Sequence, residues 1–237
     1  MSTGVTFDNR IHTERDWGLK LISVYIPMPD PKTQTVDIPG GDGTIDLTEI
    51  YGRPAYKDRD GLELAFDLMD GDYTTWFMKY SQFAAEIHGR KVKMVLDDDP
   101  DHYYMVRLNL DGKKSNQVYS QITFSGSAEP FKYDLIATNE PWLWDPFNFE
   151  TGVIREIGEV EITAKNNTVT IIGAGVDTPP VFVVSQADNL QLTYGGRTYT
   201  LQVGRNRFPA VRVGKEDVTL MFSGTGKFEI EYRGRYL

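Results

Sequence analysis

The stretch "KVKMVLDDDPDHYYMVRLNL", residues 91–110, decides the expected fold class. Its first part places Val92, Met94 and Leu96 at alternate positions, and after an acidic segment Tyr104, Val106, Leu108 and Leu110 alternate again. Successive side chains of a strand point to opposite faces, so a period of two predicts a strand with one buried face. The stretch therefore predicts a β-hairpin with an acidic turn.

The flanking segments extend this β pattern. Residues 61–68, "GLELAFDL", and 117–131, "QVYSQITFSGSAEPF", also alternate apolar and polar side chains, and 16–26 predicts a strand with a bulge. One helix is expected over 72–89, with an apolar stripe of Trp76, Phe77, Tyr80, Phe83, Ala84 and Ile87. Asp72 or Thr74 can cap its start, and Gly89 suits the left-handed residue that follows a helix.

The second half predicts a separate β-domain. Residues 134–150 contain closely spaced aromatic residues and prolines, which indicates an inter-domain connection that packs against something. From 151 onward short strands recur, including "VTLMF" and "KFEIEY", at the spacing of a β-sandwich. In the hairpin 189–203, the loop Gly195-Gly196 sets Leu192 opposite Tyr199.

The expected fold is mainly β (all-β with one helix), in two domains. We place an N-terminal β-domain at 1–133, the connection at 134–150 and a C-terminal β-sandwich at 151–237.

Composition excludes several classes of function. The net charge is −9, and acidic residues outnumber basic ones in both 1–133 and 134–237, which argues against a nucleic-acid binder. There is no cysteine, so neither disulfides nor a cysteine metal site is expected. The first residues have no apolar signal-peptide core, and no apolar run approaches the roughly 20 residues that span a bilayer. We expect synthesis in a cytoplasm.

No motif points to catalysis, a cofactor or a metal. "DIPGGDGTID", residues 37–46, lacks the Walker and dinucleotide patterns, so a glycine-shaped turn is favoured over a phosphate site. The acids of "LDDDPDH", 96–102, do not follow the EF-hand spacing and are expected in a solvated turn. His12, His88 and His102 lack partners at metal-ligand spacing, which favours structural roles.

Trp142 and Trp144 leave two alternatives open. They could stack on sugars beside a β-sandwich, or they could pack between domains, and packing is favoured. The first alternative makes the chain a carbohydrate-binding module. A glycoside hydrolase would need two carboxylates about 5–9 Å apart in a cleft, which a sequence cannot show.

Four stretches together resemble the distal tail protein (Dit) family of long-tailed siphophages. They are "VTFDNRIHTERDWGLKL" (5–21), "VDIPGGDGTIDLTE" (36–49), "EIHGRKVKMVLDDDPDHYYMVRL" (86–108) and "ITFSGSAEPFKYD" (122–134). The C-terminal half, which ends in "FEIEYRGRYL", resembles the family's second domain more weakly.

The resemblance implies a virion structural protein without catalysis, a baseplate hub component at the distal end of a non-contractile tail. It implies a homohexameric ring of N-terminal domains and a galectin-like C-terminal β-sandwich. The implied partners are the tail tube protein, the tape-measure protein and tail-associated or receptor-binding proteins. DNA would pass through the ring without sequence-specific recognition, and an acidic wall would repel its phosphates. Phage and prophage origin both stay open.

The glycine-rich loop then becomes a candidate subunit-interface arm. Its apolar side chains would not be needed in a merely solvated loop, and contacts in a hexamer would offset the entropy of ordering it. The alternative is a loop that folds back on its own domain. The predicted interface residues are Ile38, Pro39, Gly40, Ile45, Leu47, Ile50, Tyr51 and Tyr56.

Overall fold

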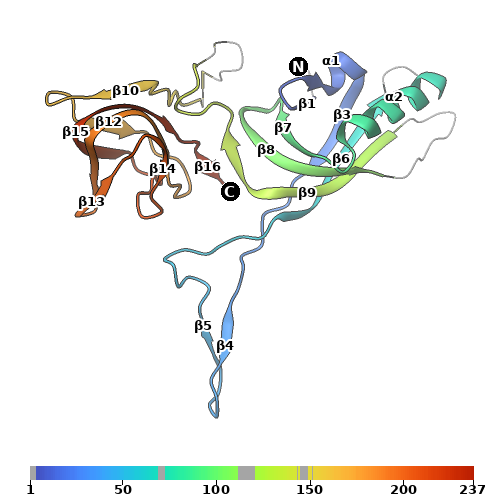
Figure 1. Cartoon of the computed structure of the whole chain (residues 1–237). Helices are drawn as coiled ribbons and strands as arrows, with labels where there is room; N and C mark the ends of the chain where they lie inside the picture. The colour runs from blue at the N-terminus through green and yellow to red at the C-terminus, as the bar shows by residue number, and fades with distance from the viewer. Residues whose placement is uncertain (1–3, 69–72, 112–120, 143, 145–148, 151) are drawn as a thin grey trace. The chain divides into compact units, whose positions relative to one another are not determined.

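The chain forms two compact units, which are described separately here. The computed structural model describes the backbone of residues 4–68, 73–111, 121–142, 144, 149–150 and 152–237, and their side chains except those of 68 and 73–76. The first unit comprises Met1–Asp99 and Tyr104–Phe131, and the second comprises Pro100–Tyr103 and Lys132–Leu237. Both are built mainly from strands, as the sequence predicts (Figure 1).

The first unit is organised around one sheet with two helices beside it. Its strands follow the order β2 (Ile11–His12), β1 (Val5–Phe7), β7 (Lys91–Leu96), β8 (Asp99–Leu110), β9 (Gln121–Asp134), β6 (Arg59–Leu68) and β3 (Leu19–Tyr25). The helices are α1 (Thr13–Trp17), which the sequence analysis did not predict, and α2 (Tyr73–Ile87). Their apolar sides pack on the sheet, where the rings of Trp17 and Phe83 meet edge to face.

The hairpin at 91–110 is confirmed, although its turn is shorter than predicted. Val92 pairs with Val106 and Met94 with Tyr104, and both valines and Met94 are buried. The ladder then shifts register and pairs Leu96 with Asp99, so Asp99 already belongs to β8. Of the predicted acidic turn, only two aspartates remain between the strands.

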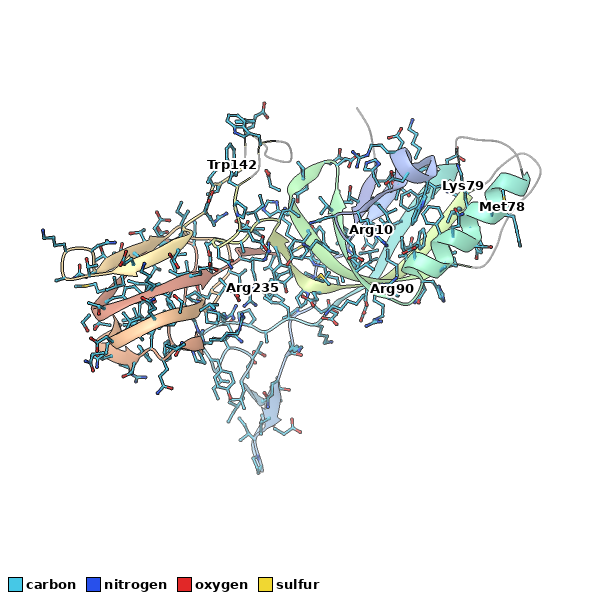
Figure 2. The ribbon with its side chains drawn as sticks, turned by 45° about the horizontal axis from the view of Figure 1, so that its top comes forward. Arg10, Met78, Lys79, Arg90, Trp142 and Arg235 are labelled. Atoms are coloured by element: carbon cyan, nitrogen blue, oxygen red, sulfur yellow. The ribbon has the colours of Figure 1, made fainter. Side chains whose placement is uncertain are left out.

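The expected helix and bulge are both present. α2 ends at Ile87, and Gly89 follows with a left-handed φ of 69°. Phe83 is buried, but Phe77, which we placed on the apolar stripe, is half exposed. Met78, labelled on α2 in Figure 2, is also exposed. Of the two predicted N-terminal caps of α2, Asp72 lies outside the described residues, and the side chain of Thr74 is not among those described. The bulge of β3 lies between Leu21 and Ser23.

The second unit is a single curled sheet. Its strands are β10 (Glu159–Ile162), β15 (Val218–Glu231), β12 (Val181–Tyr194) and β13 (Arg197–Thr200) in that order, with β11 (Thr168–Ile171) on β15 and β14 (Gly204–Arg207) on β12. β12 and β15 pair from Val181 and Glu231 to Thr193 and Met221, with two register shifts that bend them. The bent halves enclose a core that contains Phe182, Phe222 and Phe228.

The predicted strands "VTLMF" and "KFEIEY" are one strand rather than two. They join as β15 through Gly224, which has a φ of 81°. A Cβ there would lie 2.2 Å from the carbonyl oxygen of Asn189, so only glycine fits this bend. The predicted hairpin register is confirmed, because Leu192 pairs with Tyr199.

Candidate interaction surfaces

The glycine-rich segment forms a projecting hairpin, which we call the arm (residues 27–58). β4 (Thr35–Asp37) pairs with β5 (Thr44–Asp46), and Val36 faces Ile45 directly across the ladder (Figure 1). Backbone hydrogen bonds join the two limbs nearer the base: Lys32 N to Ala55 O (2.7 Å), Lys57 N to Asp30 O (2.8 Å) and Leu47 N to Gln34 O (2.7 Å). The arm is therefore a two-stranded ribbon.

The tip of the arm is a glycine turn, as predicted. Gly40 and Gly43 have φ values of 73° and 85°, a left-handed conformation that glycine adopts without steric cost. The amide of Gly41 donates to the carbonyl of Ile38 at 3.1 Å, so part of the turn's polar backbone is paired internally.

The arm carries apolar side chains that its own chain does not cover. Tyr51 is 85% exposed, and Ile38, Ile45 and Ile50 are also exposed. Of the other predicted interface residues, Pro39 and Gly40 are exposed, while Leu47 and Tyr56 are partly buried. The sequence analysis missed Met28 and Val36, although Val36 sits two positions before Ile38 and so shares its face.

The base of the arm is fixed to the first unit by a buried arginine. Arg59 is 2% exposed, and its guanidinium donates to the carbonyl oxygens of Pro27 (2.9 Å) and Pro130 (3.0 Å). It lies 5.6 Å from the ring centroid of Tyr104. Burial lowers the pKa of Arg59, and Tyr104 opposes that shift. Arg59 thus joins the start of the arm to β9.

In the second unit, aromatic residues of the predicted connection cluster together. The rings of Trp142 and Trp144 are 4.9 Å apart, and those of Trp144 and Phe149 are 5.4 Å apart. Trp144 and Phe149 are each 68% exposed, whereas Trp142 is partly buried. Figure 2 labels Trp142. We call these three residues the aromatic cluster. Within the second unit, Trp144 and Phe149 therefore stay exposed.

A buried ionic cluster holds the C-terminal residues. Asp134 lies 3.1 Å from Arg155, and the Tyr236 hydroxyl donates to Asp134 at 3.2 Å. The amide of Gly234 also donates to Asp134, at 2.8 Å. Burial, reinforced by Asp134, raises the pKa of Tyr236 to about 12. β16 (Arg235–Tyr236) pairs with the end of β9 beside it. These groups bind one another, which indicates a structural role.

Two of the three histidines, His12 and His88, accept backbone amides. Buried His12 accepts the Arg15 amide at 3.1 Å through Nδ1 and contacts Asp97 at 3.1 Å through Nε2. His88 accepts the Leu110 amide. Asp97 also accepts the Gly4 amide, so the expectation of a fully solvated acidic turn is wrong for this residue.

The described residues contain neither a group of side chains arranged to hold a metal ion nor a membrane-spanning helix. Within them, no group of three or more His, Asp or Glu side chains is arranged to hold a metal ion. None of the helices that the structure describes is long and apolar enough to cross a membrane.

Comparison with known proteins identifies a fold. No family model and no curated protein matches the chain. Among solved structures, the chain is similar to the crystal structure of Dit (gp 19.1) of SPP1, a paradigm of the hub adsorption apparatus in phages that infect Gram-positive bacteria. The two chains superpose with a TM-score of 0.61 over 100% of each, at 13% identity. The resemblance to the Dit family is thus confirmed at the level of the fold.

Proposed function

We propose that this chain, which has the fold of a phage tail hub protein, is a structural component of the hub at the distal end of a long non-contractile tail. The observation that carries the proposal is the match to SPP1 Dit over the full length of both chains. In this role the chain would act in the virion tail, without catalysis. Its partners would be the tail tube, tape-measure and tail-associated or receptor-binding proteins.

The arm is the proposed contact between copies of the chain in this hub. Its ribbon leaves both faces in solvent, and Val36 and Ile45 form an apolar pair on one of them. Isolated two-stranded hairpins are marginally stable in water, so burial of that pair against a neighbour would stabilise the arm.

This kind of contact is compatible with a closed ring. An arm that reaches a different surface on the next copy makes a heterologous interface, and such interfaces close into rings when the rotation allows. We propose six copies, with a lumen through which DNA passes. The net charge of −9 per chain would keep DNA phosphates from adhering to the wall.

Negative-stain electron microscopy of the purified chain over a concentration series tests the proposal. Six-fold rings with an open centre are expected, and native mass spectrometry should give the mass of six chains. Rings of another symmetry, or a closed two-fold dimer, would contradict the hexameric hub.

The aromatic cluster favours a second candidate function, carbohydrate binding. Exposed aromatic faces such as that of Trp144 are suited to stacking on sugar rings. A glycan array probed with the wild type and with Trp144→Ala tests this candidate. Binding that is lost in the variant would support it, and equal signals from both proteins would reject it.

A further inference from the structure

The outer edge of β3 is an open strand edge of the first unit's sheet. β3 is the last strand in the sheet order, and no strand that the structure describes pairs with the edge opposite β6 (Figure 1). Such an edge presents unpaired backbone N–H and C=O groups and can accept a further strand. The other end of the sheet differs, because β2 is only two residues long and leads directly into α1. β3 is therefore the end of the sheet that is suited to accept another strand.

The open edge of β3 lacks the charges that usually keep such edges apart. Natural edge strands often carry charged side chains, which discourage pairing with other chains. The only charged residue of β3 is Lys20, and residues 21–29 contain none, although 25% of the whole chain is charged. The bulge at Ile22 interrupts the strand, so its regular outer part is residues 23–25. These three residues are exposed and uncharged.

Residues 23–25 leave part of the apolar core uncovered. Val24 pairs with Leu64, which is completely buried, so both side chains point to the core side of the sheet. Val24 is nevertheless 39% exposed, and no described strand lies beyond it. Ser23 and Tyr25 alternate with Val24 and therefore point to the opposite face. The edge thus has an apolar core side and a polar outer side.

The ribbon of the arm has the same division between its two faces. Val36 and Ile45 pair across the ladder on one face, and Ile38, two residues beyond Val36, lies on that face too. Asp37 and Asp46 alternate with these residues, so they lie on the opposite face. Each strand of the ladder is three residues long, and among the described strands neither has a partner on its outer edge.

We propose that the arm ribbon of one copy adds to the open edge of β3 in a second copy. Main-chain hydrogen bonds join the two edges, so the faces of the ribbon continue the faces of the sheet. The apolar face then extends the core side and covers Val24, while the aspartates emerge on the outer side with Ser23 and Tyr25. β3 carries no acidic residue that would repel these aspartates. The inference rests on the proposed function, because it names the surface that receives the arm in the ring.

Two other occupants of the edge account for fewer of these observations. Pairing of β3 with β3 of a second copy would also extend the sheet, but it would leave Val36, Ile38 and Ile45 of both arms exposed. Such a contact is two-fold and does not by itself continue into a ring of six. A strand of a different protein would leave the apolar face of the arm uncovered as well. Only the arm covers both apolar surfaces in one contact.

Pairs of single-cysteine variants test the proposal, since the chain has no native cysteine. Ser23→Cys is mixed with a differently tagged chain that carries Thr35→Cys or Thr44→Cys, then oxidised. All three side chains are exposed, and both threonines lie on the aspartate face of the ribbon, which is expected beside Ser23. Met221→Cys, at an exposed position of β15, replaces Ser23→Cys in the matched control. We expect a disulfide-linked heterodimer between Ser23 and one of the threonine positions, at a several-fold higher yield than in the control.

The outcomes separate this inference from the proposed function. Rings without a link from Ser23 to either threonine position overturn the docking site and leave the hub standing. A link without rings supports the docking site and counts against the closed hexamer. A disulfide between two Ser23→Cys chains, at a higher yield than the link to the arm, overturns the proposal in favour of β3 pairing with itself. Absence of both rings and links overturns both proposals.

A charge placed on the edge supplies a second test that does not depend on cysteines. Val24→Lys should raise the concentration for half-assembly by about tenfold, because a lysine on an edge strand opposes pairing and the apolar contact of Val24 is lost. Met221→Lys is the control and should leave assembly unchanged. In the wild type, the backbone amides of residues 22–25 should exchange hydrogen several-fold more slowly after assembly. Assembly of Val24→Lys at the wild-type concentration, with the fold intact by circular dichroism, overturns the docking site.

Discussion

The triple substitution Val36→Ser, Ile38→Ser and Ile45→Ser removes the apolar face of the arm. These side chains are 47%, 40% and 53% exposed, so roughly half of each remains to be covered by a neighbour. Full burial of such a side chain stabilises by about 2 kcal/mol, so covering half contributes about 1 kcal/mol each and about 3 kcal/mol per interface. At about 1.4 kcal/mol per tenfold change, each contact between copies should weaken about 100-fold.

The assay has two readouts, because the same residues affect folding and assembly differently. Dilution series by light scattering should show assembly only at much higher concentration. The free energy of unfolding of the monomer in urea should fall by no more than about 1.5 kcal/mol, about 0.5 kcal/mol for each of three surface substitutions. Met221→Ser, which removes another exposed apolar side chain, is the control and should leave assembly unchanged. Unchanged assembly in the triple variant, or a large loss of monomer stability, would refute the interface role of this face.

Four other substitutions or titrations test the fold. Tyr232→Phe should raise the free energy of unfolding in urea by about 1 kcal/mol, because the buried Tyr232 hydroxyl finds no hydrogen-bond partner among the described residues. Gly126→Ala should lower it by about 2–3 kcal/mol, since a Cβ there would lie 2.1 Å from the carbonyl oxygen of Arg107. Arg59→Ala should lower it by about 2–4 kcal/mol through two lost charge-assisted hydrogen bonds, and should speed limited proteolysis within the arm. The pKa of Tyr236, about 12, exceeds the value of about 10 for an unfolded tyrosine. Its contribution to stability is therefore complete below pH 10 and is lost toward pH 12. Burial also raises the pKa of Tyr232, so an absorbance titration should show late-titrating tyrosines, and Tyr236→Phe should lower the amplitude of that late step without removing it.

Local patterns predicted those parts of the fold that local chemistry determines. The two-residue loop Gly195-Gly196 allows only a tight turn. The pairing of Leu192 with Tyr199 was therefore predicted by counting residues outward from this loop along both strands. Gly89 likewise predicted the end of the helix, because glycine readily adopts the left-handed φ that follows a helix.

Features that depend on distant contacts could not be predicted. Nothing near Arg59 in the sequence indicates burial, because its partners are carbonyl oxygens 32 and 71 residues away. Likewise, "VTLMF" and "KFEIEY" were predicted as separate strands, whereas Gly224 between them forms a bend inside β15, where Asn189 approaches closely.

The contrast between the base and the tip of the arm bears on how copies would assemble. At the base, Arg59 is buried and bonded, so this end is ordered before any partner arrives. At the tip, three ladder pairs and a glycine turn hold a ribbon that is exposed on both faces. Ordering each residue opposes folding by roughly 1–2 kcal/mol, which three exposed pairs offset poorly. Contact with a neighbour should therefore complete the ordering of the tip. The fixed base limits the positions that the tip can occupy before it meets that neighbour. Hydrogen exchange in residues 35–46 should then be fast in the monomer and slow in the assembled ring, with the base protected in both.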